Sequence, residues 1–162
     1  MTLHINNLAR YWNKITGTKN DNNMKQKINV LVVEDNEYYN NLIFNALQQS
    51  THFFRQEENY ELVLHSFINS HDFMQSIDSR EFRDNDIIAF VDHNMGNGIT
   101  GAQIIGQMRK RNNNTLAVLL SQSKIVEEKS APDNHDFFVV KDTFAPALCR
   151  LYLDQYIENK FL

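Results

Sequence analysis

Three carboxylic acids directly follow short apolar runs in this sequence. Glu34 and Asp35 come after INVLVV, and Asp92 comes after DIIAFV. Acids that lie close together repel one another unless a cation compensates their charge. A hard cation such as Mg²⁺ suits an all-oxygen pocket, whereas zinc suits it poorly because the sequence has no Cys/His cluster. If the three acids meet, the pattern therefore predicts a Mg²⁺ site.

Two further polar residues end apolar runs in the second half of the chain. Ser121 follows TLAVLL, and Lys141 follows DFFVV. An ammonium group can hold an anion, and a hydroxyl can hydrogen-bond to an incoming phosphoryl oxygen. A metal-bound carboxylate with a cation beside it is suited to attack a phosphoryl donor. We therefore predict that Asp92 accepts a phosphoryl group.

The elements that must position these residues alternate in type along the chain. β-branched apolar runs predict strands, and apolar residues at helical spacing predict helices between them. The predicted strands are 28–35, 60–67, 86–92, 115–121 and 136–142, and the predicted helices are 37–49, 70–78, 100–111, 123–131 and 144–159. This alternation predicts an α/β fold with a five-stranded parallel sheet in the order 2-1-3-4-5 and helices on both faces. The acids, Ser121 and Lys141 then meet at the carboxyl ends of the strands.

Two segments of the first half need separate comment. In the first helix, the spacing predicts an inward side formed by Tyr39, Leu42, Ile43, Ala46 and Leu47. Residues 50–59 are longer than such a connection needs and are interpreted as an insertion. Within it, the Phe53–Phe54 pair is predicted to join the core rather than to contact a partner.

The bulk properties exclude several classes of protein. The chain has 162 residues, a formal net charge of -4 and a single cysteine, Cys149. The charge gives no case for nucleic acid or an anionic membrane, and one cysteine rules out an internal disulfide. No apolar run approaches the roughly 18 residues of a membrane span. We expect a protein of the cytoplasm.

Residues 1–26 differ from residues 27–162, which we expect to form one domain. Leu8, Tyr11, Trp12 and Ile15 lie at helical spacing, and residues 17–23 are polar and typical of a linker. Two alternatives follow. Either Met24 begins the native chain and the leader is an upstream extension, or the leader contains a helix that packs on the domain or on a second copy.

The set VVED, AFVDHNMGNGITG, LLS and VVK resembles the receiver domain of two-component response regulators over about residues 27–156. The resemblance implies a flavodoxin-like receiver fold. It also implies that Glu34, Asp35 and Asp92 hold Mg²⁺ together with the backbone carbonyl of Asn94. Asp92 resembles the phosphoacceptor, and Lys141 occupies the position of the invariant lysine. Ser121 and Phe138 occupy the positions of the two switch residues.

The resemblance further implies a phosphorylation-dependent signalling switch rather than a turnover enzyme. A sensor histidine kinase or a histidine phosphotransfer domain would donate the phosphoryl group. Output would pass to a downstream protein through the face formed by the fourth predicted helix, the fifth strand and the last helix. We expect a stand-alone receiver, similar to the single-domain chemotaxis regulators, because only six residues follow Tyr156. A homodimer is an open alternative.

Several residues depart from the family pattern. Gly96 and Asp142 stand where the family usually has prolines, and Gln122 stands where a small residue is usual. Asp142 lies next to Lys141 and is an alternative partner for its ammonium outside the pocket. The departures favour one rival, a pseudo-receiver that binds partners but takes no phosphate. A phosphatase with an aspartate nucleophile is disfavoured, since residue 94 is an asparagine where that chemistry usually needs an acid.

Overall fold

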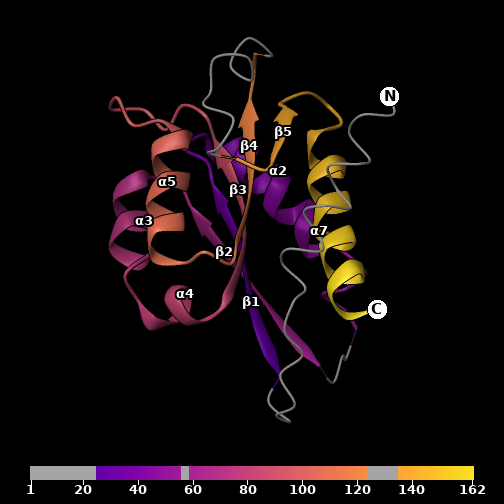
Figure 1. The fold of residues 1–162 in the computed structure, drawn as a ribbon. Helices are drawn as coiled ribbons and strands as arrows, with labels where there is room; N and C mark the ends of the chain where they lie inside the picture. Colours follow the sequence, from indigo (N-terminus) through magenta and orange to yellow (C-terminus); the bar gives the residue numbers. More distant parts are fainter. Residues whose placement is uncertain (1–24, 56–58, 124–134) are drawn as a thin grey trace.

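The computed structural model describes residues 25–55, 59–123 and 135–162, and the strands within these ranges form a single sheet (Figure 1). The order is β2-β1-β3-β4-β5, and every neighbouring pair is parallel. The predicted fold class and strand order are therefore confirmed. The strands are β1 (Gln26–Val33), β2 (Tyr60–Phe67), β3 (Asp86–Asp92), β4 (Thr115–Ser121) and β5 (Phe137–Val140).

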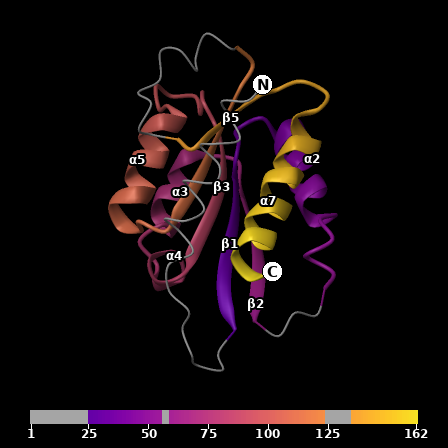
Figure 2. The ribbon, with the colours of Figure 1, turned by 45° about the vertical axis from the view of Figure 1, so that its right-hand side comes forward.

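Helices cover both faces of the sheet (Figures 1 and 2). One face carries α2 (Glu37–Gln48) and α7 (Ala145–Phe161), and the other carries α3 (Ser70–Ser76), α4 (Arg80–Asp84) and α5 (Gly101–Arg111). The short helix α4 was not predicted. The predicted helix at 123–131 and the leader before residue 25 lie outside the described residues, apart from Ser123.

Alternate strand residues face two separate cores, as expected for a sheet covered on both sides. In β1, Val30 and Val32 pack in the core under α2 and α7, whereas Leu31 and Val33 pack in the core under α3 and α5. All seven residues of β3 and all seven of β4 are buried. This burial holds the carboxyl ends of the central strands, and the polar residues that follow them, in fixed positions.

The buried side of α2 differs from the prediction. Asn40, Ile43 and Leu47 are its buried residues, while Leu42 is exposed and Tyr39 is half-buried. The Asn40 amide donates to the carbonyl oxygens of Glu34 at 3.1 Å and of Phe67 at 3.2 Å. A polar residue takes the inward position because it satisfies main-chain groups at the ends of β1 and β2.

Only one of the two phenylalanines in the predicted insertion packs against the core. Phe53 packs against the core under α2 and α7, as predicted, but Phe54 is 74% exposed. The buried ring of His52 forms a 3.0 Å hydrogen bond with the Tyr60 hydroxyl, and Ser50 donates to Asp154 of α7. These contacts attach the segment after α2 to β2 and α7.

The first strand and the last helix meet at the amino-terminal edge of the sheet. The side chains of Gln26 and Lys160 both donate to the same carboxylate oxygen of Asp86, at the start of β3. Asp86 is 5% exposed, so its charge is paired inside the protein. In the ranges that the structure describes, no helix has the length and apolar character needed to cross a membrane.

Candidate functional site

The carboxyl ends of four strands form one cluster of polar side chains. Glu34 and Asp35 follow β1, Asp92 ends β3, Ser121 ends β4 and Lys141 follows β5. The two acidic elements come together because β1 and β3 are neighbours in the sheet, with Val33 beside Val91. The Lys141 amide donates to the Ser121 carbonyl at 2.8 Å and so places Lys141 beside the end of β4.

The Lys141 ammonium bridges two buried carboxylates. Its Nζ lies 2.5 Å from Glu34 Oε2 and 2.6 Å from Asp92 Oδ1. Glu34 is fully buried, Asp92 is 5% exposed, and the lysine side chain is 4% exposed. The charges therefore interact in a pocket that is largely protected from water, where an ion pair is stronger than at the surface.

The environment shifts the ionisation of both buried acids in the same direction. Burial raises the pKa of Glu34, Lys141 opposes this increase, and the nearby Asp92 charge adds to it. Burial likewise raises the pKa of Asp92, against Lys141, and the Asp35 charge adds to the increase. The Lys141 ammonium alone therefore does not compensate the negative charge of the carboxylates in the pocket.

The acidic cluster has the donors and the charge that suit a hard divalent cation. One oxygen each from Glu34, Asp35 and Asp92 lie within 4.8 Å of one another. Three carboxylates and one ammonium give an excess of 3 − 1 = 2 negative charges when all are ionised. The pocket offers only oxygen ligands, which Mg²⁺ prefers. These residues therefore suit Mg²⁺.

The loop after β3 places Asn94 beside this cluster. The antiparallel bridge between Asn94 and Thr100 uses the His93 carbonyl and the Met95 amide. The Asn94 carbonyl takes no part in that bridge, and the Asn94 main chain acts to lower the pKa of Asp92 against the effect of burial. The predicted carbonyl ligand thus belongs to a residue whose main chain lies beside the predicted phosphoacceptor.

Two glycines allow the main chain to pass close to the acids. Gly96 has φ +68°, and a Cβ there would lie 3.3 Å from Asp35 Oδ2. The backbone angle explains the absence of proline at this position, since proline requires φ near -65°. At Gly101 a Cβ would lie 2.3 Å from the Asp92 carbonyl oxygen. The start of α5 therefore rests directly on the strand that carries Asp92.

The two predicted switch residues occupy different surroundings. Ser121 is 5% exposed, and its hydroxyl oxygen accepts a 3.2 Å hydrogen bond from the Ser123 amide. Phe138 is half-buried and packs against the core under α3 and α5. Its ring lies beside the His135 ring, with centroids 6.2 Å apart. The structure places Ser121 at the cluster and Phe138 within the sheet next to it.

Asp142 does not take the Lys141 ammonium from the pocket. Its Oδ1 accepts a 2.8 Å hydrogen bond from the Phe144 amide, so the carboxylate caps the turn that leads into α7. A carboxylate bonded to the main chain two residues further on is typical of aspartate in turns. Lys141 therefore remains directed at Glu34 and Asp92.

Sequence reasoning missed one residue at the site. The Tyr39 ring lies 5.2 Å from the Lys141 ammonium, and the Tyr39 hydroxyl donates to the Lys141 carbonyl at 3.3 Å. The signal available in the sequence was its position, four residues after Asp35 and on the first turn of a helix that begins at the acidic pair.

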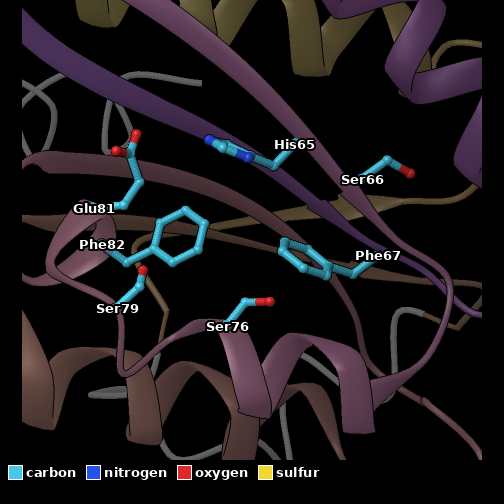
Figure 3. Close-up of a pocket in the computed structure, with 7 residues that line it drawn as sticks. All are labelled: His65, Ser66, Phe67, Ser76, Ser79, Glu81 and Phe82. Atoms are coloured by element: carbon cyan, nitrogen blue, oxygen red, sulfur yellow. The ribbon is translucent and has the colours of Figure 1, made fainter.

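A separate cleft of about 400 Å³ lies where β2 faces α3 and α4 (Figure 3). Two polar side chains that β2 contributes to it already have partners. His65 bonds to the Asn29 amide oxygen at 2.9 Å, and Ser66 donates to Asn40 at 2.6 Å. Burial lowers the pKa of His65, so its ring is neutral near pH 7. The lining residues are His65, Ser66, Phe67, Ser76, Ser79, Glu81 and Phe82.

The fold and the position of the acidic cluster define a response regulator receiver fold, and solved structures agree. The BeF₃-activated DrrB receiver domain is 18% identical, with a TM-score of 0.58, over 83% of this chain and 99% of that one. TrrA from Thermotoga maritima in complex with Mg²⁺ and BeF is 22% identical, with a TM-score of 0.55, over 80% and 98%.

A third similar structure is the phosphorylated cyanobacterial phytochrome response regulator RcpA, at 18% identity and a TM-score of 0.55, over 83% of this chain and 93% of that one. No protein-family model matches the chain, and no curated protein does either. The resemblance to receiver domains predicted from the sequence is confirmed at the level of the fold.

Proposed function

We propose that this protein is a receiver that accepts a phosphoryl group on Asp92 in the presence of Mg²⁺. The observation that carries the proposal is the position of the Lys141 ammonium, 2.5 Å from Glu34 and 2.6 Å from Asp92, with Asp35 in the same cluster. A nucleophile, a cation and an acidic pair that suits Mg²⁺ thus occur together at the carboxyl edge of a receiver fold.

The transfer step follows from these groups. An Asp92 carboxylate oxygen attacks the phosphorus, and the bond from phosphorus to the donor's leaving group breaks with its electron pair. Bound Mg²⁺ would neutralise charge on the phosphoryl oxygens and would be held by Glu34, Asp35, Asp92 and the Asn94 carbonyl. Lys141 pairs with a phosphoryl oxygen, which a cation stabilises as charge develops there. The Ser121 hydroxyl can donate to another.

The biological donor would be a histidine kinase or a histidine phosphotransfer domain. Phosphorylation would act as a switch and not as a step of a turnover enzyme, with output passing to a protein partner at the face that includes β5 and α7. A location in the cytoplasm is part of this proposal, whereas a homodimer and a leader helix stay open alternatives.

The test is phosphoryl incorporation from acetyl phosphate, followed by intact mass. We expect a gain of one phosphoryl group that requires Mg²⁺ and is absent in Asp92→Asn. Asp78→Asn is the matched control, because Asp78 is an exposed acid paired with Arg111, which lies at the opposite end of α5 from the residue that contacts Asp92. A folded wild type that binds Mg²⁺ but takes no phosphoryl group from this donor or from histidine kinases would refute the proposal in favour of a pseudo-receiver.

A further inference from the structure

The orientation of Lys141 depends on a residue outside the sheet. Two carboxylates contact its ammonium, and the third contact is the face of the Tyr39 ring, 5.2 Å from Nζ to the ring centroid. A cation over an aromatic face is attracted by the negative potential of the ring, and more strongly where water is excluded. The lysine side chain is 4% exposed, so its ammonium satisfies that condition.

Tyr39 also contacts the other end of the same lysine. Its hydroxyl donates to the Lys141 carbonyl at 3.3 Å, across 102 positions of sequence. The Lys141 amide donates to the Ser121 carbonyl at 2.8 Å, so the peptide on each side of Lys141 has a fixed partner. The Asp142 carboxylate is occupied by the Phe144 amide and does not compete for the ammonium.

The position of Tyr39 is itself fixed at the start of α2. Asn36 caps the helix, and its side chain accepts a 3.1 Å hydrogen bond from the Tyr39 amide. The helix that starts at the acidic pair thus brings a rigid aromatic group to the lysine.

We propose that Tyr39 is a positioning residue that holds the Lys141 ammonium between Glu34 and Asp92, and thereby sets how strongly this ammonium competes with Mg²⁺ for the pocket. The proposal deepens the proposed function and rests on it for its role in phosphoryl transfer. Lys141 pairs with two carboxylates that are also candidate Mg²⁺ ligands, so any freedom given to the ammonium changes both processes.

Loss of the Tyr39 ring should have opposite effects on Mg²⁺ binding and on phosphorylation. Without the ring, the ammonium spends more time away from the carboxylates, and the positive charge that repels Mg²⁺ is reduced. The same displacement removes a cation from the place where the phosphoryl oxygens arrive. Loss of the ring should therefore tighten Mg²⁺ binding and slow phosphorylation, whereas general damage to the fold would weaken both.

Three variants separate the contributions. Tyr39→Leu removes the ring and the hydroxyl, while Tyr39→Phe keeps the ring and removes only the bond to the Lys141 carbonyl. Tyr38→Leu is the matched control, since it is the same change one position earlier, at a residue that is 69% exposed and meets the Tyr39 ring only edge-on, with centroids 6.0 Å apart. Thermal unfolding of each variant would establish that the fold is retained.

The first measurement is the proton shift of the Lys141 ε-methylene in ¹³C-resolved NMR spectra. A proton over a ring face is shifted upfield, so we expect an upfield shift in the wild type, in Tyr39→Phe and in Tyr38→Leu, and its loss in Tyr39→Leu. This signal requires neither Mg²⁺ nor phosphorylation. A shift in the wild type that Tyr39→Leu leaves unchanged would overturn the proposal whether or not the protein takes a phosphoryl group.

The second measurement pairs Mg²⁺ titration with acetyl phosphate incorporation. Loss of a cation–ring contact in a site without water should change a rate or a dissociation constant by about threefold to tenfold. In Tyr39→Leu we expect incorporation slower by about that factor and a lower Mg²⁺ dissociation constant, with Tyr38→Leu matching the wild type. Parallel weakening of both in Tyr39→Leu, or equal behaviour of Tyr39→Leu and Tyr38→Leu, would overturn the proposal. If the wild type takes no phosphoryl group, the proposed function fails, and the NMR shift and the Mg²⁺ affinity still decide the role of Tyr39.

Discussion

A methyl group at position 101 should separate α5 from the strand that carries Asp92. In Gly101→Ala the new Cβ would lie 2.3 Å from the Asp92 carbonyl oxygen and 2.8 Å from Leu119 Cδ1. Ordinary contact begins near 3.4 Å, so the start of the helix must retreat by 3.4 − 2.3, or about 1 Å. The 2.8 Å bond from the Gly101 amide to the His93 carbonyl opposes that movement.

The expected loss of stability follows from this overlap. Overpacking of a well-packed site costs about 1–3 kcal/mol. For a domain of this size, the melting temperature should fall by about 2–4 °C for each kcal/mol. Because the Asp92 main chain is displaced, phosphoryl incorporation should also slow. Urea unfolding followed by circular dichroism measures the first effect, and acetyl phosphate incorporation measures the second.

Gly106→Ala is the matched control in the same helix. A Cβ at position 106 meets nothing within 4 Å. Alanine in the middle of a helix is favoured over glycine by about 0.5–1 kcal/mol, so this variant should be more stable than the wild type. If Gly101→Ala is as stable as Gly106→Ala, the close approach of α5 to the end of β3 is not a constraint, and the reasoning is refuted.

Three further predictions concern the charges and the loop at the site. The folded state raises the pKa of Asp92, so its charge costs stability above that raised pKa; the cost disappears as the pH falls to the ordinary value near 3.9. Without Mg²⁺, Asp92→Asn should therefore have a higher melting temperature than the wild type at pH 7. The difference should shrink at low pH or at saturating Mg²⁺. A lower melting temperature of Asp92→Asn at pH 7 would contradict this. Lys141→Met leaves two buried carboxylates without their cation. It should lower the free energy of unfolding, measured with urea, by about 3–5 kcal/mol without Mg²⁺ and by less with Mg²⁺. An unchanged urea midpoint would argue against the pairing. Gly96→Ala and Gly98→Ala each place a side chain at a positive φ and should each lower the free energy of unfolding by about 1 kcal/mol. Only Gly96→Ala places a Cβ 3.3 Å from Asp35, so only this variant should weaken Mg²⁺ binding in a titration. Equal Mg²⁺ affinities of the two variants would show that the contact has no effect.

The fold could be predicted because its signals are local. Central strands that are buried on both sides, such as β3 and β4, read as continuous apolar runs, and their alternation with helices leaves few topologies. The grouping of Glu34, Asp92 and Lys141 then followed from the rule that parallel strands present their carboxyl ends at one edge. The five-residue helix α4 is too short to show a helical period and was missed.

The remaining differences depend on contacts that a sequence pattern does not contain. Asn40 points inward because two main-chain carbonyls at strand ends need a donor, and amphipathic spacing assigns a polar residue to the surface. The contact of Tyr39 with Lys141 joins positions 102 apart. For Asp142, a local bond to the main chain prevailed over the attraction of a neighbouring ammonium.

The shared carboxylate of Asp86 has a practical consequence for protein engineering. Because Gln26 and Lys160 donate to the same oxygen, the first strand and the last helix that the structure describes come together at this carboxylate. A domain with adjacent ends can be inserted into a surface loop of a host protein without forcing the two ends of that loop apart. Fusion to a host near Gln26 and Lys160 would thus transmit any change of shape on metal binding or modification through two neighbouring attachment points.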